Sequence, residues 1–177
     1  MRSVFLLAPV LLAAASAASA APAHLPADDR RQLAELTQRY LERRADKITA
    51  RPQEPGFGVP TTEAFAARLR VDEAKLADRR ARYATFNLGS YSHAKVRTEL
   101  TRVVVAQDGS AVVHVQEVTE LHFGKPAGVT HSAFATGHVL IFDRTPAGWA
   151  LAAAMRPPGS VCKVPPETQF CGVRSER

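Results

Sequence analysis

Hydrophobic residues follow two different periods along this chain, and each period predicts one kind of element. Between residues 29 and 48 apolar side chains recur every three or four positions, as on one face of an amphipathic helix that starts at Asp28 or Asp29: Leu33, Leu36, Tyr40, Leu41, Ala45 and Ile48. Pro and Gly residues between 50 and 60 predict a loop. A second helical stripe follows Thr61 or Thr62, with a capping signal at Asp72 that could restart it. The first half of the chain therefore predicts two or three helices.

From Ser92 to Met155 the pattern becomes that of β-strands. Turn signals at 107–110, 124–128 and 144–148 divide this stretch into four strands. Each predicted helix is apolar on one side only, so each must pack against a surface, and the sheet is the only one large enough. The sequence thus predicts an α+β fold, with the helices on one face of a four-stranded antiparallel sheet.

The turns also predict a register. The Asp108-Gly109 pair is typical of a two-residue hairpin loop. Extended along the strands, the three turns place Val104 opposite Val113, Glu117 near Thr136 and Phe142 near Trp149. Alternation then gathers nearly all large apolar side chains on one face, where the helices would lie. The other face is small, β-branched and charged, as on a solvated sheet surface.

Three charged or titratable residues, Arg102, Glu117 and His138, fall on the apolar face in this register, with Thr136 beside them. A buried charge without a partner is costly, so these residues are either paired or face a pocket. One interpretation is a structural Arg102–Glu117 salt bridge with His138 beside it. A second is a ligand-binding pocket formed by all four residues. A third is a catalytic acid–base pair of Glu117 and His138.

Histidines on the charged face raise the question of a metal site. His122 falls opposite His131, and Glu120 is the nearest further ligand. Lys95 on the same face disfavours a bound cation, and we interpret these histidines as solvated. No nucleophile elbow and no phosphate-binding glycine loop occurs in the sequence. We therefore expect no metal and no cofactor, and we favour a small secreted binding or accessory module. The alternative is a pocket enzyme, of hydrolase or isomerase type, that uses Glu117 and His138.

Two segments resemble a known fold family. The stretch VTHSAFATGHVLIFDRTPAGWALAAA, with its Gly148-Trp149-x-Leu151 closing strand, resembles cystatin-like, nuclear-transport-factor-2-like domains. The earlier YLERRADKI is similar to a helix in the N-terminal region of secreted amidase-domain proteins. The resemblance spans residues 29–156 and implies a strongly bent sheet wrapped around a helix, a cystatin-like roll. It implies no amidase activity, because too few residues follow for that domain.

The two ends of the chain predict export and a tail closed by a disulfide. Arg2, an apolar run of about a dozen residues and Ala18-Ser19-Ala20 have the pattern of a signal peptide at 1–20, cleaved after Ala20. A flexible lead at 21–28, one domain at 29–156 and an irregular tail at 157–177 would follow. Cys162 and Cys171, both in that tail, are expected to form a disulfide in an oxidising compartment.

Charge excludes one class of partner and leaves others open. The formal net charge is +6, and it falls to +5 once Arg2 is removed with the signal peptide. Basic and acidic residues alternate along the helices, which is typical of solvated faces and not of a nucleic-acid interface. We expect no nucleic acid and no lasting membrane anchor. The partner would be a small ligand, a secreted or envelope protein, or a second copy in a homodimer.

Overall fold

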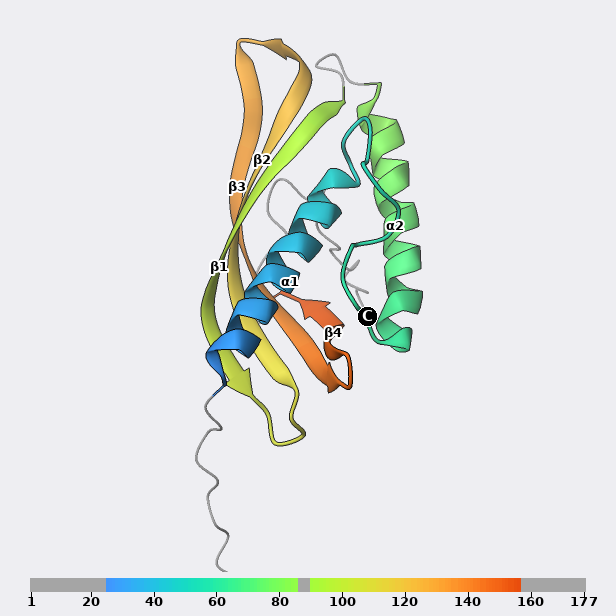
Figure 1. Cartoon of the computed structure of the whole chain (residues 1–177). Helices are drawn as coiled ribbons and strands as arrows, with labels where there is room; N and C mark the ends of the chain where they lie inside the picture. Colours follow the sequence, from blue (N-terminus) through green and yellow to red (C-terminus); the bar gives the residue numbers. More distant parts are fainter. Residues whose placement is uncertain (1–24, 86–89, 157–177) are drawn as a thin grey trace, which may run out of the picture.

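The computed structural model describes residues 25–85 and 90–156. Two helices precede four strands: α1 (Ala27–Asp46), α2 (Glu63–Tyr83), β1 (Tyr91–Val105), β2 (Ala111–Ala127), β3 (Val129–Thr145) and β4 (Gly148–Met155) (Figure 1). The strands form an antiparallel meander in the order β1-β2-β3-β4. The predicted α+β class is confirmed, with two helices in this part of the chain and a sheet that does not close into a barrel.

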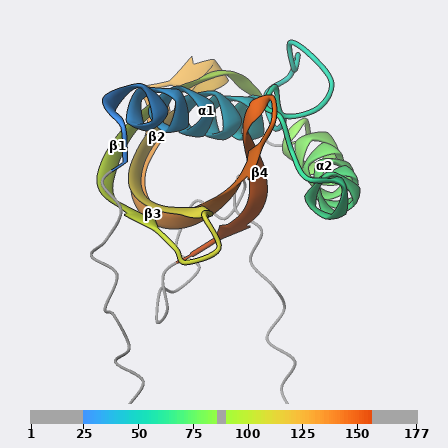
Figure 2. The same ribbon diagram turned by 60° about the horizontal axis from the view of Figure 1, so that its bottom comes forward.

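The sheet curls strongly, and α1 lies across its concave side (Figure 2). The buried side of α1 contains the apolar stripe, while Asp28 and Asp29 in the first turn and Arg43 in the last turn suit the helix dipole. The helix begins after Pro26, so the expected Asp cap is wrong. The core between α1 and the sheet combines residues from all of these elements: Leu33, Tyr40, Leu41, Val96, Val113, Leu121, Leu140, Phe142 and Leu151.

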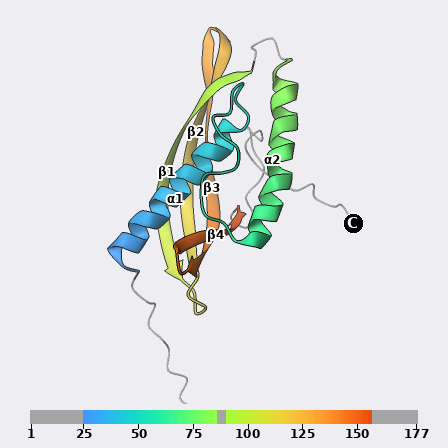
Figure 3. The ribbon, with the colours of Figure 1, turned by 45° about the vertical axis from the view of Figure 1, so that its right-hand side comes forward.

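Helix α2 lies beside the curled sheet, past α1 and the loop that joins the two helices (Figure 3). The Thr62 side chain caps it by accepting a hydrogen bond from the backbone N–H of Phe65, as the sequence predicted. The loop is fastened to β4, because Leu151 donates its N–H to Pro60 and accepts one from Thr62. No helix in the described ranges is long and apolar enough to cross a membrane.

The register of the first hairpin differs from the prediction. Its loop has three residues, 107–109, between Ala106 and Ser110, whose backbones pair at 2.8 Å. Gly109 provides the left-handed residue (φ 83°) that such a loop requires. Val103 therefore lies opposite Val113, and Val104 opposite Val112, which turns Val103 inward.

An irregularity further along β1 returns the side chains to their predicted faces. The register shifts between Leu100 and Arg102, so Leu100 pairs with Val115 and Val96 with Thr119. Both Val96 and Leu100 point to the core, as predicted. Only the end of β1 near the turn has its faces exchanged.

The β2–β3 pairing keeps its predicted faces, and the β3–β4 pairing keeps them near its turn. Glu117 lies opposite Thr136, as predicted for the second hairpin. The third hairpin is displaced by two residues, since Phe142 pairs with Leu151 and not with Trp149. Near the turn a displacement of two leaves each side chain on its predicted face, and Phe142, Trp149 and Leu151 are all buried. The register shifts again between Ile141 and Phe142, so at the end of β4 Ala154 packs against the core opposite Leu140. Met155, expected on the apolar face, is exposed instead, and its predicted place is wrong.

Candidate functional site

The predicted site residue Glu117 is at the centre of a buried polar cluster beneath α1. Its side chain is fully buried, and its carboxylate Oε2 accepts a hydrogen bond from Nη2 of Arg44 at 2.6 Å. Arg44 comes from the last turn of α1 and is itself only 4% exposed. The pair therefore ties the end of α1 to the middle of β2 with a buried ion pair.

Two further side chains complete the coordination of this carboxylate. Nε2 of His138, on β3, lies 2.5 Å from Oε2 of Glu117, and the Thr119 hydroxyl donates to Oε1 at 2.7 Å. Nη2 of Arg44 is 3.5 Å from the same imidazole nitrogen. Both carboxylate oxygens of Glu117 are thus engaged, one of them twice.

The electrostatics of the cluster follow from burial and from this coordination. Burial by itself would raise the pKa of Glu117, but Arg44, His138 and Thr119 outweigh it and lower the pKa to about 2. Burial lowers the pKa of His138, and the Arg44 charge adds to this, while Glu117 acts in the opposite direction. His138 is therefore a neutral imidazole near pH 7 that donates its Nε2 proton to Glu117.

These properties suit a structural role better than acid–base catalysis. A carboxylate with a pKa of about 2 is a weak base, and a general base works best with a pKa near the operating pH. Glu117 also has no exposed surface through which it could reach a substrate. The cluster therefore resembles the salt-bridge interpretation of the sequence, with a different arginine.

Arg102 is the predicted site residue that lies elsewhere. It is exposed and opposite His114, on the outer face of the sheet, because the three-residue loop reverses this end of β1. The expected Arg102–Glu117 bridge is therefore wrong. Thr136 is partly buried opposite Glu117, so the structure brings Glu117, His138 and Thr136 together and leaves Arg102 outside.

Sequence reasoning missed Arg44, although a signal for it exists. The residue lies four positions after Tyr40 and three after Leu41, which puts it on the buried stripe of α1. All arginines of this helix were expected to point outward. An arginine at a stripe position facing a glutamate on the apolar sheet face would have indicated the pair.

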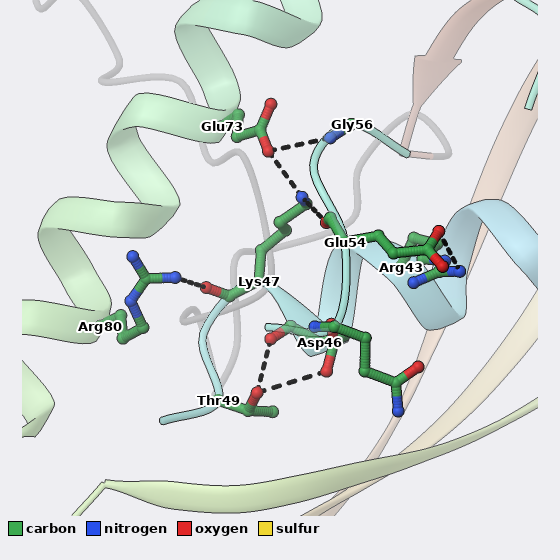
Figure 4. A network of polar contacts seen from close by, with 9 residues as sticks. Arg43, Asp46, Lys47, Thr49, Glu54, Gly56, Glu73 and Arg80 are labelled. Carbon is green, nitrogen blue, oxygen red and sulfur yellow. Dashed lines mark hydrogen bonds and ion pairs between the residues drawn. The ribbon is translucent and has the colours of Figure 1, made fainter. Parts of the chain in front are cut away.

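A second polar network joins the end of α1 to α2 (Figure 4). Lys47 is only 4% exposed, and its Nζ donates to Glu73 Oε1 and to the backbone oxygen of Glu54, both at 2.6 Å. Glu73 also accepts the N–H of Gly56 at 3.1 Å. Burial would raise the pKa of Glu73, but Lys47 and this N–H lower it. Arg80 donates to the backbone oxygen of Lys47 at 3.3 Å.

A crevice with two hollows follows this network along α2, between the helix and the loop at 52–61. The first hollow, of about 360 Å³, is bordered by four charged residues, Lys47, Glu54, Glu73 and Arg80, and by the apolar Pro52, Pro55 and Ala77. The second, of about 470 Å³, has a largely apolar lining of Phe57, Val59, Pro60, Ala66 and Leu69, with Arg70 at its side. Glu73 borders both hollows, so they adjoin. The sequence showed only a Pro- and Gly-rich loop here, and no motif indicated a binding site.

The histidines of the outer face form a stack across three strands. The His122 ring lies 4.2 Å from His93 and 5.1 Å from His131, centroid to centroid, and its Nε2 is 3.3 Å from Glu120. His122 and His131 face each other as predicted. In the ranges that the structure describes, no three His, Cys, Asp or Glu side chains are grouped so as to hold a metal ion. Cys162 and Cys171 lie outside the described residues, and their disulfide stays a prediction.

Comparison with known proteins yields only distant structural likenesses. No family model and no curated protein matches the chain. The intermembrane space region of the chloroplast protein ARC6 is similar with a TM-score of 0.46 and 9% identity, over 72% of this chain and 96% of that one. A conserved protein from Planctomyces limnophilus DSM 3776 has a TM-score of 0.36 and 15% identity, over 72% of this chain and 98% of that one. Neither likeness carries a function over to this chain.

Proposed function

We propose that this chain is an exported, non-catalytic binding module of the cystatin-like roll class. Its ligand is an extended, acidic segment of a partner protein that carries an apolar side chain, held in the crevice along α2. The observation that carries this proposal is the pair of adjoining hollows beside α2, one bordered by four charged residues and the other mainly by apolar ones.

The shape of the crevice favours an extended chain over a compact molecule. The lining residues run along α2 from Ala66 to Arg80, which is about 21 Å at a rise of 1.5 Å per residue. An extended peptide of about six residues has that length at roughly 3.3 Å per residue. Recognition of an extended segment in a groove beside a helix needs no catalytic group.

The charges of the crevice favour an acidic segment. Its two carboxylates are already neutralised, Glu73 by Lys47 and Glu54 by Arg43. Arg70 and Arg80, one in each hollow, form no ion pair with a carboxylate in the described part of the chain. Arg70 and Arg80, ten residues apart on one helix, can therefore bind negative groups of a ligand. Phe57 and Leu69 line the second hollow, where a hydrophobic side chain of the ligand would pack.

The alternative of a pocket enzyme has weaker physical support. It would require Glu117 or His138 to exchange protons with a substrate, whereas both are buried and bound to each other. Ligand binding at Glu117, Thr136 and His138 would likewise require the Arg44 ion pair to open. Breaking a buried pair of this kind costs several kcal/mol.

Fluorescence anisotropy with a labelled six-residue peptide of alternating glutamate and leucine tests the proposal. We expect saturable binding that Arg80→Glu weakens about tenfold, the equivalent of one lost charge-assisted contact. Arg82→Glu is the matched control, because Arg82 is in the same last turn of α2 but is exposed and outside the crevice. Equal binding by both variants, or tighter binding of a lysine–leucine peptide, would overturn it.

Export is proposed on the sequence alone. A chain processed at the predicted site begins with Ala21. Amino-terminal sequencing of the protein recovered from the envelope or medium of a producing bacterium tests this; recovery of the intact amino terminus in the cytoplasm would refute it.

A further inference from the structure

A separate hollow of about 560 Å³ lies on the other side of the loop, between the exposed side of α1 and the start of β1. Arg39 and Arg43 line it from α1, one helical turn apart, and Lys95 lines it from β1. Its volume is within the range of small-molecule sites. Neither the predicted cluster at Glu117 nor the crevice along α2 includes Arg39 or Lys95.

The carboxylates of this hollow are already occupied by neutral donors. Glu42 accepts a hydrogen bond from the side-chain amide of Gln38 at 2.7 Å. Asp46 accepts the backbone N–H of Gln53 at 2.7 Å and the hydroxyl of Thr49 at 3.3 Å (Figure 4). These hydrogen bonds hold both carboxylates in place without using any of the three cations.

The cations, in contrast, retain unused donors. Arg43 binds Glu54 through Nη2 at 2.8 Å, but its Nη1 is buried without a hydrogen-bond partner. Arg39 and Lys95 are exposed and form no ion pair within residues 25–85 and 90–156. Two exposed cations without an ion pair, beside an arginine that has one donor still unpaired, form an arrangement that suits an oxyanion; Nη1 of Arg43 would have to turn toward the hollow to take part.

The loop holds the two arginines in position. A Cβ at Gly58 would lie 3.3 Å from Cγ of Arg43 and 3.5 Å from Cδ of Arg39, so the backbone of this residue packs directly on both side chains. Gly58 has φ +69°, which a larger residue adopts only with strain. The stems of the arginines are thus confined before any ligand arrives, which lowers the entropic cost of binding.

We propose that Arg39, Arg43 and Lys95 form a binding site for a phosphate group carried by a larger molecule. The planar guanidinium groups would bind its oxygens. Lys95 lies on the outer face of the edge strand β1, opposite Glu120, and its ammonium would reach round this edge to add a point charge. The shared chemistry, a phosphoryl group with at least one negative charge, occurs both in small metabolites and in phosphate-containing polymers. The site is independent of peptide binding in the crevice.

Isothermal titration with glycerol 3-phosphate and with polyphosphate, at constant ionic strength, tests whether the site binds phosphate. It also tests whether that phosphate belongs to a small molecule or to a polymer. Arg39→Gln and Lys95→Gln are expected to weaken binding about tenfold each without unfolding the protein, since both side chains are exposed. Arg31→Gln is the matched control, an exposed arginine of the same helix outside the hollow. Tighter binding of glycerol 3-phosphate identifies a small-molecule site, and tighter binding of polyphosphate a polymer site.

Three results would overturn the proposal. One is the absence of saturable heat with both probes. Another is equal binding by Arg31→Gln and Arg39→Gln, which would show a diffuse charge effect. The last is binding of sodium sulfate and chloride as tight as that of the phosphates, which would show an adventitious ion only. Because none of these variants touches α2, a failure here leaves the peptide assay unaffected.

Discussion

Replacement of Arg44 by methionine is expected to destabilise the fold by about 3–5 kcal/mol at neutral pH. The substitution keeps most of the side-chain length but removes the positive charge. Glu117, fully buried, would then be an ionised carboxylate supported only by His138 and Thr119. Total stabilities of single domains are about 5–15 kcal/mol, so this loss would be large.

The pKa of Glu117 gives an independent magnitude. A value of about 2 against the usual 4.5 corresponds to about 3 kcal/mol, at roughly 1.4 kcal/mol per pH unit. Because this pKa is depressed in the folded state, the contribution is present above pH 4.5 and is lost as the pH falls towards 2. In Arg44→Met burial is no longer opposed by the guanidinium, so the pKa rises. The variant should therefore lose less stability than the wild type on acidification.

Urea unfolding followed by the fluorescence of the buried Trp149 measures both effects. At pH 7 the midpoint should fall by about 2 M for an m-value of about 2 kcal/mol/M. Arg31→Met, which alters an exposed pair with Asp28, should cost at most about 1 kcal/mol. Adding Glu117→Met to Arg44→Met should recover much of the loss, since no buried charge remains. A loss below about 1 kcal/mol in Arg44→Met, or no recovery in the double variant, would refute the reasoning.

Other positions give further predictions. Gly109→Ala should lower stability by about 1 kcal/mol in thermal unfolding, because φ is 83° and no atom lies within 4 Å of the new methyl group. Gly148→Ala should also lower stability, because φ is 115°, while the side-chain amide of Gln32, 2.8 Å from the new methyl group, can move aside; an unchanged melting temperature would contradict the positive φ. Lys47→Met should speed amide hydrogen exchange in α2, because it removes the 2.6 Å ion pair to that helix, and unchanged exchange would show that the pair does not hold it. Cys162 and Cys171 should react with iodoacetamide only after reduction, and alkylation of the unreduced protein would disprove the disulfide.

Much of the architecture could be predicted because it depends on local patterns. The 3.6-residue stripes identified α1 and α2, and alternation identified the four strands. The second hairpin was placed correctly, with Glu117 opposite Thr136. His138 and Glu117 were therefore recognised as neighbours on the concave face. The fold class and half of the buried cluster follow from the sequence for this reason.

The first hairpin shows where local patterns stop being sufficient. An Asp-Gly pair fits both a two-residue and a three-residue loop, and the two differ by one position in register. That difference moved Arg102 from the core face to the solvent face. The irregularity after Leu100 then restored the predicted faces further along, so apolar alternation could not reveal the error.

By itself the sequence determined which segments become helices and strands, and that Glu117 needs a buried partner. Only the tertiary structure decided that the partner is Arg44, 73 residues away along the chain, because the choice depends on where α1 crosses the concave sheet. The crevice along α2 and the hollow at Arg39 were also decided there. The crevice lies between a loop and α2, and the hollow between α1 and β1, and periodicity within one segment contains no information about the space between two segments.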